Sequence, residues 1–189
     1  MPTQRQLRER LETLATILYR YGATFPVPEL ERYASGTLRF SFIAELPGSD
    51  TPQPATIRLA EIWEPVLATD ASDYRRAEYA YDFVDHPRNR RRAFHGHDPD
   101  YFAHEFAVLV HEHCEETLGS PDCSHYFGLP VDAFEAIDAF TALWALGGSL
   151  GCADLRCMTG SRLAHACRQR PWRPRRGWAS KRRASSLHS

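Results

Sequence analysis

Histidines gather in one short stretch of this chain of 189 residues. Seven of the nine histidines lie between residues 86 and 125, and two of the five cysteines, Cys114 and Cys123, lie in the same window. Imidazole has an unperturbed pKa of about 6.5, so it exchanges protons near neutral pH, and its neutral form binds transition metals. The stretch therefore predicts acid–base or metal chemistry, and its histidines are His86, His95, His97, His104, His111, His113 and His125.

Two pairs within this stretch have the form His-x-His: His95 with His97, and His111 with His113. On a β-strand, residues i and i+2 point to the same face of the sheet. If the two strands are neighbours with matching faces, four imidazoles converge. The competing interpretation of the second pair is a helix over residues 99–116, on which these two histidines would diverge.

One chemistry that these residues predict is cleavage of RNA without a metal cofactor. One group takes the proton of the ribose 2′-hydroxyl, which attacks the adjacent phosphorus, and a second group protonates the leaving 5′-oxygen. We expect His111 and His113 to be this acid–base pair, and His95 and His97 to be a second acid–base pair or a phosphate contact. The protein would then be an endoribonuclease that needs no cofactor.

Groups that would bind the RNA lie close by in the sequence. Arg90, Arg91 and Arg92 come shortly before His95, and arginine binds phosphate through paired hydrogen bonds. Tyr81 belongs to an aromatic stripe whose rings would stack on bases. The competing interpretations are a solvated loop for the arginines and core packing for the aromatic stripe.

The same four histidines support a second hypothesis, a metal-binding domain. Histidines at i, i+2 spacing are ligands for zinc or for a redox metal such as iron, so the cofactor implied here is zinc or iron. The spacing matches no established motif, because the segment His111-Glu112-His113 has its second histidine at i+2 rather than at i+4, and the chain has no Cys-x-x-Cys pair. The metal ligands would be His95, His97, His111 and His113.

A third hypothesis is a non-catalytic protein-interaction domain, and it follows from the distribution of charge. Residues 1–154 hold all 24 acidic residues and 13 basic ones, a net charge of −11, whereas residues 155–189 hold ten basic residues and no acidic one, a net charge of +10. An acidic body of this kind would engage a basic partner. In this hypothesis the histidines only form hydrogen bonds within the fold.

The hydrophobic periodicity predicts an α+β fold. Leucines at spacings of three and four predict an amphipathic helix over residues 3–21, and a similar pattern predicts a closing helix over residues 131–146. Between these two helices apolar and polar residues alternate, so we expect an antiparallel sheet of about five strands. The expected strands cover residues 38–46, 56–64, 74–84, 90–97 and 107–114.

The composition predicts one folded domain followed by a tail. Apolar residues make up 43% of the chain and charged residues 25%, which excludes a collagenous, wholly disordered or small disulfide-scaffold protein. We expect a single α+β domain over residues 1–148. Residues 149–189 would be a disordered basic tail or the product of a shifted reading frame, with nucleic-acid binding as the functional alternative.

No segment typical of export or membrane insertion is visible. The N-terminal stretch is charged from Arg5 onward, and the longest nearly apolar run, about residues 139–153, is shorter than the roughly 20 residues that span a bilayer. We expect a cytoplasmic protein without membrane contact. Its cysteines would be thiols or metal ligands rather than disulfides.

The order of these motifs resembles the TumE-type toxins, which belong to the RelE-like superfamily of type II toxin–antitoxin systems. The resemblance covers about residues 74–146 and rests on the segments 78–82, 90–95 and 111–113 and on the helix that begins near residue 131. It implies an endoribonuclease toxin whose target is RNA, including RNA on the ribosome. It also implies a cognate antitoxin protein as the partner that neutralises the toxin.

Overall fold

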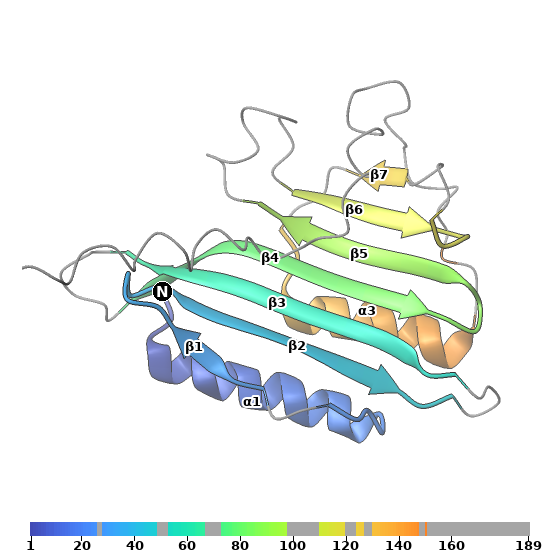
Figure 1. Cartoon of the computed structure of the whole chain (residues 1–189), viewed down its shortest axis with the longest axis horizontal. Helices are drawn as coiled ribbons and strands as arrows, with labels where there is room; N and C mark the ends of the chain where they lie inside the picture. The colour runs from blue at the N-terminus through green and yellow to red at the C-terminus, as the bar shows by residue number, and fades with distance from the viewer. Residues whose placement is uncertain are drawn as a thin grey trace, which may run out of the picture.

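The computed structural model of the chain describes residues 1–25, 28–48, 53–66, 73–97, 110–119, 124–126, 130–147 and 150. An N-terminal helix leads into an antiparallel sheet, and a second helix closes the fold (Figure 1). The predicted α+β class is therefore confirmed. The expected tail over residues 149–189 lies outside the described residues, apart from Leu150. The elements are α1 (Gln4–Arg20), β1 (Leu30–Arg32), β2 (Leu38–Leu46), β3 (Ala55–Pro65), β4 (Tyr74–Asp85), β5 (Arg90–Gly96), β6 (Val110–Glu115), β7 (Ser124–Tyr126) and α3 (Ala133–Leu146).

The N-terminal helix α1 forms where its caps and its leucine stripe predict it. The hydroxyl of Thr3 accepts a hydrogen bond from the backbone of Gln6, and the Gln6 side chain accepts one from the backbone of Thr3, so two amides of the helix start have partners. The four leucines of the stripe are all buried against the sheet. They are Leu7, Leu11, Leu14 and Leu18, and the burial of each stabilises the fold by roughly 1.5–3 kcal/mol.

The closing helix α3 carries equally clear end signals. Asp132 accepts a hydrogen bond from the backbone of Phe134, and Glu135 accepts one from the backbone of Asp132. The helix ends at Gly147, whose φ of 61° is a left-handed conformation that glycine adopts at little cost. Ile137 and Phe140 face the sheet and are fully buried.

The strands form a simple meander in which each strand pairs antiparallel with its neighbour in sequence. Within the described part of the chain the sheet has seven strands in the order β1 to β7, rather than about five. The two additional strands, β1 and β7, have three residues each. Strand β6 covers residues 110–115, so its histidines lie on a strand and the competing helix is excluded there. Residues 107–109 of the predicted strand lie outside the described residues.

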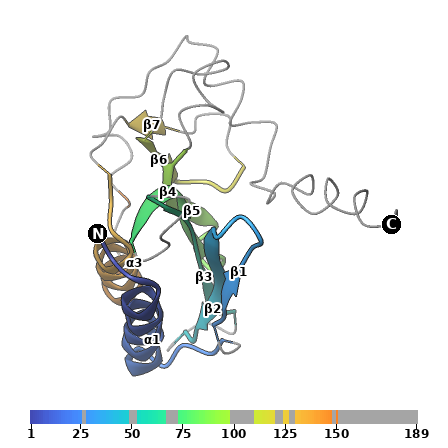
Figure 2. The ribbon, with the colours of Figure 1, turned by 90° about the vertical axis from the view of Figure 1, so that its left-hand side faces the viewer.

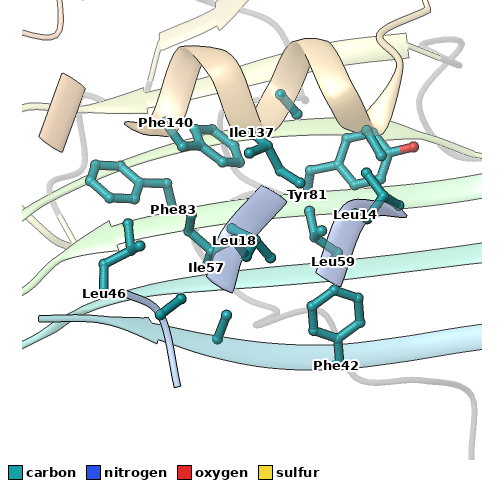
Figure 3. Packing of buried hydrophobic residues seen from close by; sticks show 14 of the residues in the cluster. Leu14, Leu18, Phe42, Leu46, Ile57, Leu59, Tyr81, Phe83, Ile137 and Phe140 are labelled. Atoms are coloured by element: carbon teal, nitrogen blue, oxygen red, sulfur yellow. The ribbon is translucent and has the colours of Figure 1, made fainter. Parts of the chain in front are cut away.

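Both helices cover the same face of the sheet (Figure 2). Leu14 and Leu18 of α1 and Phe140 of α3 point toward the aliphatic and aromatic side chains of β2, β3 and β4 (Figure 3). In each strand the alternate residues point to the opposite face, where neither α1 nor α3 packs. Within the described residues no helix is long and apolar enough to cross a membrane.

A buried carboxylate connects the two helices to the sheet. Glu61 on β3 is fully buried on the helix-covered face, where it accepts hydrogen bonds from the Trp63 indole at 2.7 Å and from the Arg10 guanidinium at 3.0 Å. Arg10 also donates to Asp132 at the start of α3, at 2.9 Å. One guanidinium of α1 is thereby bound to both the sheet and α3.

Candidate functional site

The register of β5 and β6 brings the two His-x-His pairs together. His95 pairs directly with His111, and Ala93 pairs with His113. Phe94, between His95 and Ala93, belongs to the core under the helices, so its two neighbours in the strand point to the opposite face. His111 and His113 of β6 pair directly with these two residues, so their side chains point to the same face. The four histidines therefore share the face of the sheet that lies away from α1 and α3.

The four imidazole rings are in direct contact. The centroid of the His95 ring lies 5.2 Å from that of His111 and 4.7 Å from that of His113. The ring of His97, just beyond the end of β5, lies 4.9 Å from that of His111. This is the convergence predicted for neighbouring strands with matching faces.

Three of these rings are arranged as metal ligands would be. One ring nitrogen from each of His95, His97 and His111 lies within 4.8 Å of the other two. Ligand nitrogens about 2.0–2.1 Å from a tetrahedral zinc ion lie roughly 3.3 Å from one another. The three nitrogens would therefore have to move closer together to share one zinc ion. His113 adjoins the group, because its Nε2 atom lies 2.8 Å from Nε2 of His111.

The histidines are shielded from water. His95, His111 and His113 are 5%, 8% and 5% exposed, and His97 is half-buried. Burial, and then the neighbouring His95, lower the pKa of His97 to about 3. The His97 ring is therefore neutral at neutral pH and keeps a lone pair for a ligand.

A carboxylate adjoins the rings. Asp82 of β4 pairs with Ala93 and so lies between Arg91 and His95 on the same face. It accepts hydrogen bonds from Nε of Arg91 at 2.9 Å and from Nη2 of the same residue, and its Oδ2 atom lies 3.5 Å from Nε2 of His95. Burial alone would raise the pKa of the Asp82 carboxyl, but His95 and Arg91 outweigh it and hold that pKa well below its usual range. Asp82 is therefore ionised beside the histidines.

The three arginines predicted to hold a phosphate do not form one cluster. Alternation along β5 places Arg91 on the histidine face and places Arg90 and Arg92 on the other face. Each of them is already bound to a buried carboxylate, so the expectation of a shared phosphate clamp is corrected. The ion pairs are Arg90–Asp85 at 2.9 Å, Arg91–Glu115 at 3.1 Å and Arg92–Glu112 at 2.5 Å, in addition to the contact of Arg91 with Asp82.

Tyr81 is not placed to stack on a base. Its side chain is 0% exposed on the helix-covered face, where its hydroxyl donates a hydrogen bond to Glu61. Burial, and then the charge of Glu61, raise the pKa of the Tyr81 hydroxyl. The competing interpretation, core packing, describes this residue correctly.

Of the remaining histidines and cysteines of the stretch, the structure describes His86, Cys114 and the backbone of His125. His86 is exposed in the turn after β4, and its Nε2 atom lies 3.1 Å from the Thr56 hydroxyl. His125 is on β7, where its backbone pairs with His113. Cys114 is buried and disulfide-bonded, so the expectation of a thiol or metal ligand is wrong at this position. His104 and Cys123 lie outside the described residues.

Sequence reasoning found the four histidines and missed Asp82. The alternation in residues 74–84 places Asp82 on the polar side of its strand, but only the register of β4 against β5 shows that it lies next to His95. Comparisons with protein-family models, with curated proteins and with solved structures find no match to this chain. The functional interpretation therefore rests on the geometry of the site.

Proposed function

We propose that this protein is a zinc-binding domain in which His95, His97 and His111 are the metal ligands. The observation that carries the proposal is the mutual approach of their three ring nitrogens to within 4.8 Å on one face of the sheet. Three imidazoles without a thiolate suit zinc and neighbouring transition metals, and three histidines are a known ligand set for zinc.

Burial and protonation state support the same proposal. A cluster of cationic imidazoles would repel one another in a site of low dielectric, whereas neutral rings with lone pairs gain from sharing a cation. The lowered pKa of His97 keeps that ring neutral. His113, whose Nε2 atom is 2.8 Å from that of His111, is the residue placed to complete a fourth position.

The test is the affinity of the 189-residue chain for Zn²⁺. Metal-free protein is titrated with Zn²⁺ in competition with a chromophoric chelator, and the purified protein is analysed for metal by mass spectrometry. We expect one tightly bound ion per chain, and in His97→Ala and His111→Ala a loss of affinity greater than the roughly 10–100-fold that follows loss of a supporting group alone. Circular dichroism verifies that each variant is folded.

The matched control is His86→Ala. His86 is a histidine of the same stretch, but it is exposed and contacts Thr56 rather than the cluster. This variant is expected to bind Zn²⁺ as the wild type does. A wild-type protein that competes with the chelator no better than the His111→Ala variant would refute the proposed zinc site.

A second candidate function is the metal-independent ribonuclease, neutralised by a cognate antitoxin, which the TumE-type resemblance implies. The observation that favours it is the pair His111 and His113, whose Nε2 atoms lie 2.8 Å apart, so that one ring donates a proton and the other accepts it. Its weakness is the phosphate contact, because Arg90, Arg91 and Arg92 are all bound to carboxylates. RNA cleavage that persists in EDTA and is lost in His113→Ala would favour this candidate over the zinc site.

A further inference from the structure

Asp82 has one oxygen committed to an arginine and the other directed at a histidine. Its Oδ1 atom accepts two hydrogen bonds from the Arg91 guanidinium, through Nε at 2.9 Å and through Nη2. Its Oδ2 atom faces Nε2 of His95 at 3.5 Å. All three side chains lie on the histidine face of β4 and β5, because Ala93, the partner of Asp82, separates Arg91 from His95.

This arrangement determines where the proton of a neutral His95 lies. A carboxylate oxygen accepts hydrogen bonds and is repelled by a lone pair, so the ring nitrogen that faces it carries the hydrogen. Nε2 of His95 is that nitrogen. Within the described residues it is buried and makes no hydrogen bond, and the Asp82 carboxylate, at 3.5 Å, is the charged group beside it. A neutral imidazole with its hydrogen on Nε2 has its lone pair on Nδ1.

We propose that Asp82 is the positioning residue of the site, and that by holding Nε2–H of His95 it presents Nδ1 of that ring to the metal. The inference rests on the proposed zinc site and assigns to it a ligand atom and a supporting carboxylate. A metal-bound histidine usually donates its other ring N–H to such a group, which orients the ring and makes it a better ligand.

Arg91 and Glu115 keep Asp82 in this role. Arg91 donates to Asp82 and, through Nη1, to Glu115 at 3.1 Å, and Glu115 also accepts a hydrogen bond from the backbone of Gly119 at 2.9 Å. The guanidinium compensates the charge of the Asp82 carboxylate. A carboxylate that is neutralised in this way is better suited to accept a hydrogen bond from His95 than to leave Arg91 and bind the metal itself.

The first measurement needs no variant that alters the carboxylate. The 189-residue chain is labelled with ¹⁵N and prepared without metal, and its imidazole nitrogens are assigned by comparison with His95→Gln. We expect the spectrum of His95 to show the hydrogen on Nε2 and an unprotonated Nδ1, and addition of Zn²⁺ to shift the Nδ1 resonance. A hydrogen on Nδ1 of His95 in the metal-free protein would overturn the inference.

The second measurement compares two aspartate variants of the same strand. Asp82→Asn keeps the shape of the side chain and removes its charge, and we expect it to weaken Zn²⁺ binding by about 10–100-fold, as loss of such a supporting group does. Asp85→Asn is the matched control, because Asp85 is also buried and bound to an arginine of β5, Arg90, but it points to the other face. We expect Zn²⁺ affinity within about twofold of the wild type in this control.

The outcomes separate the inference from the proposed function. If the wild-type protein binds Zn²⁺ and Asp82→Asn binds it equally well, the positioning role of Asp82 is refuted while the zinc site stands. If the wild-type protein binds no Zn²⁺, the proposed function is refuted, and the positioning role is refuted with it. The zinc site and the positioning role are both supported if Asp82→Asn binds Zn²⁺ more weakly, Asp85→Asn binds it as the wild type does, and His95 carries its hydrogen on Nε2.

Discussion

His95 and His111 face each other directly across β5 and β6, with their ring centroids 5.2 Å apart. The packing of the other face sustains this relationship. Phe94, next to His95, stacks on Phe140 of α3 with a centroid separation of 5.6 Å, and a shift of one residue in either strand would turn that strand's histidines toward the helices. The core that holds α3 on the sheet therefore also aligns the imidazoles on the opposite face.

Zinc is expected to stabilise the fold as well as to bind to it. A ligand that binds only the folded state, at a free concentration 100 times its Kd, adds about 2.7 kcal/mol to the free energy of unfolding. We expect the unfolding temperature of the wild-type protein to rise on addition of Zn²⁺ and that of His111→Ala to stay unchanged, as measured by differential scanning calorimetry. His86→Ala should respond like the wild type, and an equal rise in all three proteins would indicate binding elsewhere.

The Tyr79 ring lies so close to Gly96 that a side chain at position 96 is expected to disturb the site. A Cβ atom at Gly96, between His95 and His97, would lie 2.1 Å from a ring carbon of Tyr79, its cross-strand partner. Gly96→Ala therefore forces the ring or β5 to move, and we expect it to reduce the free energy of unfolding by about 1–3 kcal/mol and to weaken Zn²⁺ binding. Urea unfolding and the chelator competition measure the two effects.

A double-variant cycle shows whether the Tyr79 ring is the cause. In a Tyr79→Ala background the clash is gone, so Gly96→Ala should reduce the free energy of unfolding by less than it does in the wild type. Effects of the two substitutions that simply add would contradict this explanation, because residues in contact are expected to be coupled.

The sequence was sufficient for the longer helices and strands and for the histidines, because both have a local signal. Period-two alternation in β2 and β4 and the leucine stripe of α1 identify these elements within one or two residues. Strands β1 and β7 were missed because a strand of three residues is too short to display an alternation. Residues i and i+2 of a strand point to the same face, so assigning a strand was enough to place both rings of each His-x-His pair together.

The partners of the charged residues were not predictable in the same way. Arg90, Arg91 and Arg92 are consecutive in sequence, but the carboxylates that bind them come from two different strands. They are Asp82 and Asp85 of β4 and Glu112 and Glu115 of β6. Which carboxylate meets which arginine depends on strand register, and register depends on turn geometry and on packing against the helices. For the same reason, the contact between Asp82 and His95 could not be predicted from the sequence.

Capping of α3 contributes to stability through two separate contacts of one residue. Asp132 accepts a hydrogen bond from the backbone of Phe134 at 2.9 Å, and it also accepts one from Arg10 at 2.9 Å. Asp132→Ala removes both, and we expect it to reduce the free energy of unfolding by about 2 kcal/mol, the upper end of the effect of a lost N-cap. Asp132→Asn keeps the cap and should recover at least half of that loss in urea unfolding. If the two variants are equally destabilised, the ion pair with Arg10 rather than the cap is the main contribution.

The buried carboxylate of Glu61 is expected to be highly sensitive to substitution. It lies between Arg10 at 3.0 Å and Arg76 at 3.6 Å and also accepts the Trp63 indole N–H. Glu61→Gln leaves two largely buried guanidinium groups without that negative charge, and we expect it to reduce the free energy of unfolding by roughly 3 kcal/mol.

The matched control for this prediction is Glu64→Gln on the same strand. Glu64 is paired with Arg75 at 3.3 Å, and the Arg75 side chain is 67% exposed, so the loss of this ion pair should change the free energy of unfolding by less than about 1 kcal/mol. Urea denaturation followed by tryptophan fluorescence measures both variants, since Trp63 adjoins Glu61. Equal effects of the two substitutions would mean that solvent reaches Glu61 and that its buried ion pairs do not hold α1 on the sheet.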